Sequence, residues 1–110
     1  MINEFLDKIK ITSKLTRVQL EKFVKKYQSD GYTLDIGCAH SPYSQYFSHR
    51  VGLDIKPGPG VDVVGDVYHL PFKDEQFDNI LCTEVLEHLP LPQTAISEMT
   101  RVLKIGGLLI

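Results

Sequence analysis

The stretch TLDIGCAHSPYSQYFSHRVGLDI, residues 33–55, decides the fold of this chain. One apolar run ends at Ile36 and breaks at Gly37, and a second ends at Leu53 and is followed by the acid Asp54. This order of strand, small-residue turn, short helix, strand and carboxylate is typical of α/β domains that hold an adenosyl group, because a carboxylate about 20 residues past the turn can bridge two ribose hydroxyls. The stretch therefore predicts a nucleoside site at the ends of two strands.

The turn after Ile36 argues against a dinucleotide ligand. Residues 37–42 contain one glycine, whereas the G-x-G-x-x-G fingerprint needs three. A pyrophosphate also needs several N–H groups at the start of a helix. Pro42, which we expect to be the first helical residue after Ser41 as N-cap, has none to donate. We therefore expect a ligand without a diphosphate, and an NAD(P)-binding domain is kept as an alternative.

The composition is that of an ordinary globular domain, with 110 residues, 43% hydrophobic and 24% charged. A net charge of −2 gives no general attraction to nucleic acid or to an anionic membrane, so we expect neither as a partner. Residues 1–10 lack the apolar centre of a secretory signal, and no later run approaches transmembrane length, so we expect a cytoplasmic protein. Cys38 and Cys82 do not form a metal-spaced set, and we expect reduced, buried thiols.

Apolar runs alternate with helical patterns, which predicts a parallel sheet with helices packed on it. We expect strands at residues 32–36, 50–54, 61–64, 77–82 and 108–110. We expect helices at residues 2–9, from Thr16 to a stop at Gly31, at 42–49 and at 92–103, with Gly106 and Gly107 ending the last of them. Residues 56–60 form a rigid turn and not a domain linker, because apolar strands flank them.

Five ordered blocks carry a resemblance to a known family: LDIGC at 34–38, GLD at 52–54, GDVYHLPF at 65–72, FDNILCTEVLEH at 77–88 and RVLKIGG at 101–107. They resemble the successive motifs of class I S-adenosylmethionine-dependent methyltransferases, of the methyltransferase type 11 kind. The resemblance implies a Rossmann-like three-layer α/β/α fold with strand order 3-2-1-4-5. It also implies that residues 31–110 are a truncated S-adenosylmethionine-binding domain lacking strands 6 and 7, and we expect residues 1–30 to form helices that pack on it or cover it.

The resemblance implies that eight residues contact S-adenosylmethionine: Asp35, Gly37, Ala39, Asp54, Ile55, Asp66, Val67 and Thr83. Asp54 would accept hydrogen bonds from both ribose hydroxyls. The adenine would lie between Ile55 and Val67, with its amino group donating to Asp66. Gly37 would let the backbone approach the methionine part of the cofactor. These groups all belong to the carboxyl ends of parallel strands, where open α/β sheets bind ligands.

The remaining implied roles concern the methionine end of the cofactor, where Asp35 would steady the turn and Thr83 would line the cleft. Methyl transfer from a sulfonium needs little more than in-line placement of the acceptor, which we expect to be a small molecule. The first loop departs from the family's G-x-G-x-G series, because Ala39 and Ser41 carry Cβ atoms that a positive φ would strain. This departure motivates the alternative of a non-catalytic binding or partner subunit.

Glu84, Glu87 and His88 have the spacing i, i+3 and i+4, which would place them on one helical face beside the cleft. Glu84 and His88 are the candidates for a catalytic base. In some relatives a similar E-x-x-E-H holds a divalent cation. The alternative, which we favour, is that the acids suit the start of a helix and His88 caps or packs, with no metal.

The chain stops within the apolar run 108–110. A bare apolar strand edge invites pairing with another chain. We therefore expect either a truncated sequence or an edge that a second copy or a partner completes.

Overall fold

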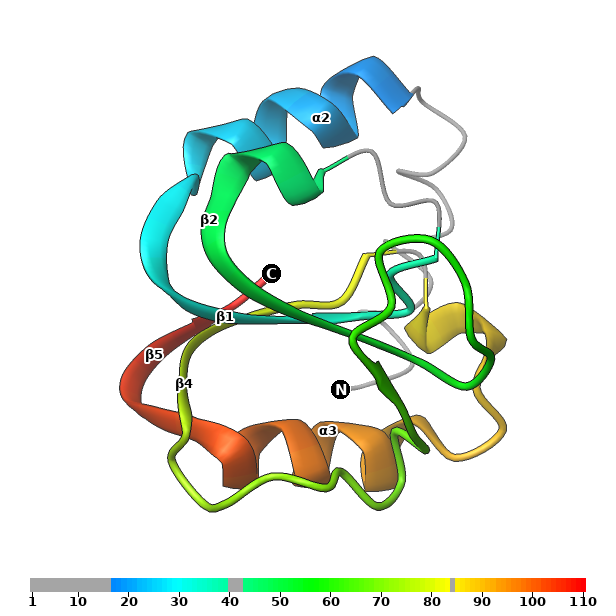
Figure 1. The fold of residues 1–110 in the computed structure, drawn as a ribbon. Coiled ribbons are helices and arrows are strands. Elements are labelled where there is room, and N and C mark those ends of the chain that lie inside the picture. The colour runs from blue at the N-terminus through cyan, green and yellow to red at the C-terminus, as the bar shows by residue number, and fades with distance from the viewer. Residues whose placement is uncertain (1–16, 40–42, 84) are drawn as a thin grey trace.

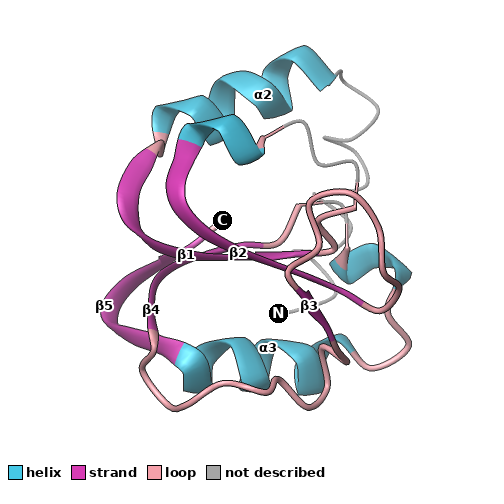
Figure 2. Cartoon of the chain, in the orientation of Figure 1, coloured by secondary structure: helices cyan, strands magenta, loops and turns pink. Residues whose placement is uncertain are grey.

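A computed structural model describes residues 17–39, 43–83 and 85–110. In this part of the chain, five parallel strands form one sheet in the order β3-β2-β1-β4-β5. The strands are β1 (Ser29–Ile36), β2 (Phe47–Asp54), β3 (Val63–Val64), β4 (Phe77–Leu81) and β5 (Leu103–Leu109). Helix α2 (Arg17–Lys26) lies on one face and α3 (Pro92–Val102) on the other (Figures 1 and 2). The predicted three-layer fold and strand order are confirmed.

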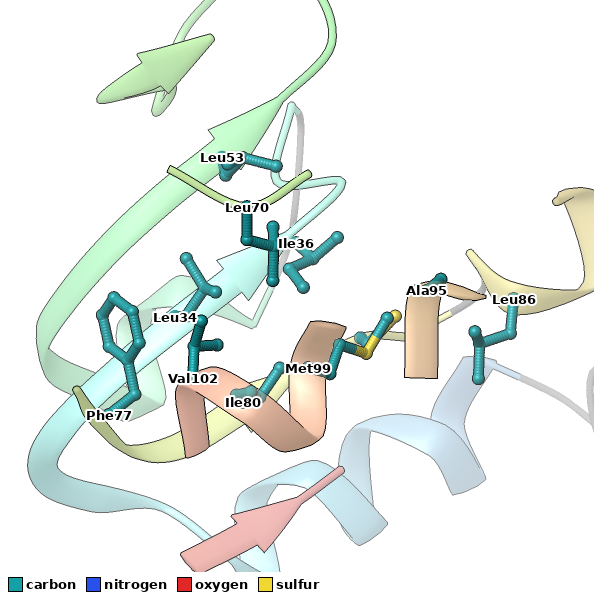
Figure 3. Packing of buried hydrophobic residues seen from close by; sticks show 11 residues of the cluster. Leu34, Ile36, Leu53, Leu70, Phe77, Ile80, Leu86, Ala95, Met99 and Val102 are labelled. Carbon is teal, nitrogen blue, oxygen red and sulfur yellow. The ribbon is translucent and has the colours of Figure 1, made fainter. Parts of the chain in front are cut away.

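The main core lies between the sheet and α3. Alternate residues of a strand point to the same face, so Leu34 and Ile36 of β1 both face this helix. From α3, Ala95, Met99 and Val102 are fully buried at helical spacing (Figure 3). The apolar stripe predicted for residues 92–103 therefore packs on the sheet.

A smaller apolar cluster lies on the opposite face of the sheet. Val24 of α2 packs with Phe47 of β2 and Leu81 of β4, and Tyr43 completes the buried set. The Tyr46 hydroxyl donates a hydrogen bond to Glu21 at 2.8 Å, which fastens α2 to the segment before β2. These contacts fix α2 on the sheet, whereas the helix expected at residues 2–9 lies outside the described residues.

The helix predicted at residues 42–49 is wrong over its described part. A short 3₁₀ turn, η1 (Ser44–Tyr46), is followed directly by β2, which begins at Phe47. Residues 37–46 are fewer than the dozen or so that a parallel crossover usually needs, so there is little chain for a helix. Phe47 is buried against α2 as the first residue of the strand, and this burial favours an early start of β2.

Two glycine positions were also predicted wrongly, because the glycines lie within strands. Helix α2 ends at Lys26, and Gly31 belongs to β1, where its N–H donates to Ser29 Oγ at 3.0 Å. Strand β5 follows α3 directly and contains Gly106, whose φ is 80°. The strand register shifts at both places, as a β-bulge does. The glycines therefore lie at irregularities of the strand pairing and do not end helices.

No helix among residues 17–39, 43–83 and 85–110 is long and apolar enough to cross a membrane.

We predict that Met99→Ala lowers the free energy of unfolding by about 2–5 kcal/mol, because it empties space between α3 and the sheet. Gln93→Ala is the control on the same helix, since Gln93 is exposed and its loss should cost less than about 0.5 kcal/mol. Urea unfolding followed by circular dichroism measures both. Equal, small effects would show that α3 is not packed as described.

Candidate functional site

The carboxyl ends of β1, β2 and β4 meet at one edge of the sheet, which is where open α/β folds bind ligands. The turn after β1, the loop between β2 and β3, and the short helix η2 (Leu86–His88) gather there (Figure 1). A shallow hollow of about 390 Å³ lies at the opposite edge, lined in part by Ser29 and Tyr46. It contains none of the site residues predicted from the sequence, so the carboxyl edge is the candidate site.

The turn after β1 directs three consecutive backbone amides at the end of β2. The N–H groups of Gly37 and Cys38 donate to the Leu53 carbonyl at 2.8 and 3.3 Å, and the Ala39 N–H donates to Asp54 Oδ2 at 3.1 Å. Gly37 has a φ of 68°, and a Cβ there would be 2.6 Å from a methyl group of Val85. Glycine is required at this position for both reasons.

Ala39 fits this turn without backbone strain. Glu75 is the one non-glycine residue with a positive φ in the described part of the chain, so Ala39 does not adopt that conformation. The strain that would follow from an alanine in the small-residue series is therefore absent at position 39. Ser41 lies outside the described residues.

The Asp54 carboxylate is oriented by the backbone on both sides. Its Oδ2 accepts the Ala39 N–H, and its Oδ1 accepts the Lys56 N–H at 3.3 Å. A carboxylate offers about four acceptor positions, so each oxygen keeps one for a further donor. Ile55, the next residue, is 71% exposed. An acid with free acceptor positions beside an exposed apolar side chain fits a ribose diol and the face of a purine.

The loop after β3 brings Asp66 and Val67 to the same edge. Asp66 Oδ1 accepts the Tyr68 N–H at 2.8 Å, which leaves the other carboxylate oxygen to accept from a ligand. Val67 is half-buried and packs on the main core. Leu70 is buried at 4% exposure and anchors the loop in the main core.

The side chain of Arg101, in α3, holds the same loop through hydrogen bonds to its backbone. Its guanidinium donates to the carbonyls of Leu70 and Phe72, both at 2.9 Å, and also bonds to Glu98 and Asp74. The hydrogen bond from Arg101 is the main cause of the lowered pKa of Glu98. No sequence pattern predicts the contacts of Arg101 with Leu70 and Phe72, because they join residues 31 and 29 positions apart in the chain.

Asp35 is buried and pairs with Arg50, a contact that was not predicted from the sequence. Its carboxylate is 3% exposed and accepts from Arg50 Nε and Nη2 at 3.2 and 3.0 Å. In the strand register Asp35 lies beside Gly52, two residues beyond Arg50, so the guanidinium reaches along β2. The one signal in the sequence was Arg50 itself. It is a cation at the start of the strand predicted at residues 50–54, where a charge inside the sheet needs a partner.

Thr83, Glu87 and His88 follow β4 at the same edge. Thr83 is half-buried, and Glu87 is mostly buried with Oε2 lacking a hydrogen-bond partner among the described residues. His88 is 76% exposed, with Nε2 3.8 Å from Glu87 Oε1. Glu84 is outside the described residues, which contain no group of three or more His, Cys, Asp or Glu able to hold a metal. The catalytic and metal hypotheses for Glu84, Glu87 and His88 stay predictions.

Both cysteines are free and buried, as expected. Burial, with further contributions from the charges of Glu87 and Asp35, raises the pKa of Cys82 to about 12. Burial is also the main cause of the raised pKa of Cys38, which Asp35 raises further and Arg50 lowers. The two thiols are therefore uncharged at neutral pH and poor nucleophiles.

A parallel sheet in this order, with a glycine turn after β1 and an oriented acid at the end of β2, defines an α/β domain of the Rossmann-like class. The family profile described as "Methyltransferase domain" matches residues 34–110. The chain belongs to this family, the class I S-adenosylmethionine-dependent methyltransferases.

Relatives of the chain include the uncharacterized protein MJ1123 of Methanocaldococcus jannaschii, 35% identical over 96 residues, which cover 79% of this chain and 46% of that protein. A human protein named "Probable tRNA methyltransferase 9B" is 35% identical over 106 residues, covering 84% of this chain and 23% of its own length. The chain thus spans less than half of these relatives. A crystallised SAM-dependent methyltransferase from Thermotoga maritima has the same fold, with a TM-score of 0.67 and 24% identity over 94% of this chain and 53% of its own.

We predict that stability falls above pH 9 through Cys82. The thiol ionises near pH 8.5 when unfolded and near 12 when folded, so the unfolded chain binds fewer protons between these values. Each pH unit in this window then costs up to about 1.4 kcal/mol. Between pH 8 and 10.5, urea unfolding should show the wild type losing about 2–3 kcal/mol more than Cys82→Ala. Equal losses in the two proteins would contradict the burial of this thiol.

Proposed function

We propose that this chain binds S-adenosylmethionine at the carboxyl edge of its sheet and transfers the methyl group to a small-molecule acceptor, as a methyltransferase of class EC 2.1.1.-. The single observation that carries the proposal is the Asp54 carboxylate, held by the amides of Ala39 and Lys56 with acceptor positions left on both oxygens. The family supports the same cofactor.

The adenosyl half of the cofactor would be held by residues after β2 and β3. Asp54 accepts from the two ribose hydroxyls, and its fixed orientation spares part of the cost of ordering a side chain on binding. Ile55 and Val67 enclose the adenine, and Asp66 accepts from its amino group. The exposed apolar area of Ile55 would be covered by the purine, which favours binding.

The methionine half would lie against the turn after β1 and the end of β4. Gly37 and Ala39 keep this turn small, while Asp35, fixed by Arg50, supports it from within the sheet. Thr83 lines the cleft beside them. The cofactor supplies an activated methyl group on a sulfonium, and the residues of this chain have only to bind it, orient it and exclude water. Glu84 and His88 are proposed as the groups that would take a proton from the acceptor.

A small acceptor is supported by the charge of the chain. A net charge of −2 provides no general attraction to a polyanion, so the proposal does not extend to nucleic acid, although one relative carries a tRNA methyltransferase name.

A second proposal concerns the edge strand β5. Ile105 is 93% exposed, and Leu108 and Leu109 are 38% and 40% exposed, which is much apolar surface for one edge strand. We propose that this edge is covered by the strands 6 and 7 that the resemblance implies, by a second copy or by a partner protein.

The cofactor proposal predicts that Asp54→Asn weakens binding of S-adenosylhomocysteine about 10- to 100-fold, because charged hydrogen bonds to ribose are worth about 1.5–3 kcal/mol each. Asp30→Asn is the matched control, since it removes the same charge from an exposed residue at the opposite edge of the sheet. Isothermal titration calorimetry measures both affinities, and circular dichroism checks the fold. Unchanged affinity in a folded Asp54→Asn protein would refute the ribose contact.

Titration with NAD under the same conditions separates the dinucleotide alternative. The wild type should bind S-adenosylhomocysteine and should not bind NAD, because residues 37–42 lack the glycines that a pyrophosphate needs. Binding of NAD alone would replace the proposal by that alternative.

A further inference from the structure

The Arg50 guanidinium links the sheet to the loop of residues 55–62, which joins β2 to β3. Its Nη2 donates to Asp35 Oδ2 at 3.0 Å and also to the carbonyl of Gly60 at 3.3 Å. Asp35 belongs to β1 and is buried, whereas Gly60 is exposed in the loop. Arg50 is therefore both the charge partner of Asp35 and a side-chain tether for the loop.

The loop lies directly against β2 at this tether. A Cβ on Gly52 would be 2.3 Å from the Gly60 carbonyl oxygen and 2.8 Å from both Arg50 Nη2 and Cys38 Sγ. The Cys38 thiol donates to the same carbonyl at 3.5 Å. Gly60 has a φ of 79°, a conformation that favours glycine. The Gly60 carbonyl is thus held by the Arg50 guanidinium and the Cys38 thiol, and it occupies space that a side chain at position 52 would fill.

Both ends of the loop are held by backbone groups. At the start of the loop, the Lys56 N–H donates to Asp54 Oδ1. At its end, the Asp62 N–H donates to the Gly52 carbonyl, and Asp62 Oδ2 accepts the Gly52 N–H at 2.8 Å. Residues 57–60 are exposed, and Pro57 and Pro59 restrict their backbone. In this middle part the Val61 N–H donates to the Gly58 carbonyl at 3.1 Å, and Arg50 and Cys38 donate to Gly60, so loss of the Arg50 bond would loosen the segment that begins at Ile55.

We propose that Arg50 is a positioning residue for the adenosyl group: it holds the Gly60 carbonyl and thereby fixes the loop that presents Ile55 beside Asp54. This inference rests on the proposed cofactor site. Arg50 touches no ligand in it and acts through the loop. Its second task, compensation of the buried Asp35 charge, concerns the stability of the sheet and is separable by substitution.

Two substitutions separate these tasks. Arg50→Lys keeps a cation beside Asp35 but lacks the rigid fork that serves Asp35 and Gly60 together. Arg50→Met removes both, and the buried Asp35 carboxylate would lose its guanidinium partner. Because this loss destabilises the fold, Arg50→Lys is the variant on which the test depends. Hydrogen exchange of residues 55–62 in the free protein reports on the tether, and calorimetric titration with S-adenosylhomocysteine reports on the site.

In Arg50→Lys, residues 55–62 should exchange faster while the urea midpoint stays near that of the wild type. The dissociation constant for S-adenosylhomocysteine should rise about threefold to tenfold, the loss of one neutral-acceptor hydrogen bond. A folded Arg50→Met protein should show a larger rise. Val51→Ala is the control: Val51 is the next residue in β2 and packs on the other face, so its loss lowers stability without touching the loop.

The results that overturn the inference are distinct from those that overturn the cofactor site. The positioning role would be refuted if residues 55–62 of Arg50→Lys exchanged at the wild-type rate. It would also be refuted if they exchanged faster while the affinity for S-adenosylhomocysteine stayed unchanged. An equal loss of affinity in Val51→Ala would show that only global stability matters. Absence of binding by the wild type would remove the cofactor site and the inference with it, whereas the exchange data would still show whether Arg50 tethers the loop.

Discussion

The site depends on the end of β2, because three consecutive amides of the turn after β1 are directed at it. Two of them share the Leu53 carbonyl, and the third, that of Ala39, donates to the Asp54 carboxylate. This arrangement is reached only with a glycine in the left-handed region at position 37. The turn therefore orients the acid in the absence of a ligand, and such preorganisation lowers the cost of binding.

The short crossover between β1 and β2 explains why Arg50 contacts both Asp35 and Gly60 on one face of the sheet. The described part of this crossover contains η1 and no α-helix, so the β2–β3 loop folds back over Gly52 on that face of the sheet. Buried ion pairs are costly unless their remaining hydrogen-bonding groups are satisfied, and the Gly60 carbonyl gives the Arg50 guanidinium one more acceptor beyond Asp35. Stability of the sheet and placement of the loop thus use one side chain.

Local patterns were sufficient for the parallel sheet, the helix α3 and the acid that ends β2, whereas the strand order followed from the resemblance to the family. The local patterns failed where the outcome depends on distant contacts. The aromatic spacing before β2 fits a helix, but packing of Phe47 on α2 favours a strand. Gly31 and Gly106 lie at irregularities of the strand pairing, a position that helix-end patterns do not distinguish. The tethers from Arg50 and Arg101 join chain segments that no spacing pattern connects.

The central claim is that the oriented acid at the end of β2 receives the ribose of an adenosyl ligand. A crystal structure of this chain with S-adenosylhomocysteine tests it most directly. The account predicts that both ribose hydroxyls lie within hydrogen-bond distance of Asp54 and that the adenine packs against Ile55. The Asp54 carboxylate should keep its bonds to the amides of Ala39 and Lys56. A ligand bound elsewhere on the sheet, or bound here with the ribose away from Asp54, would contradict it.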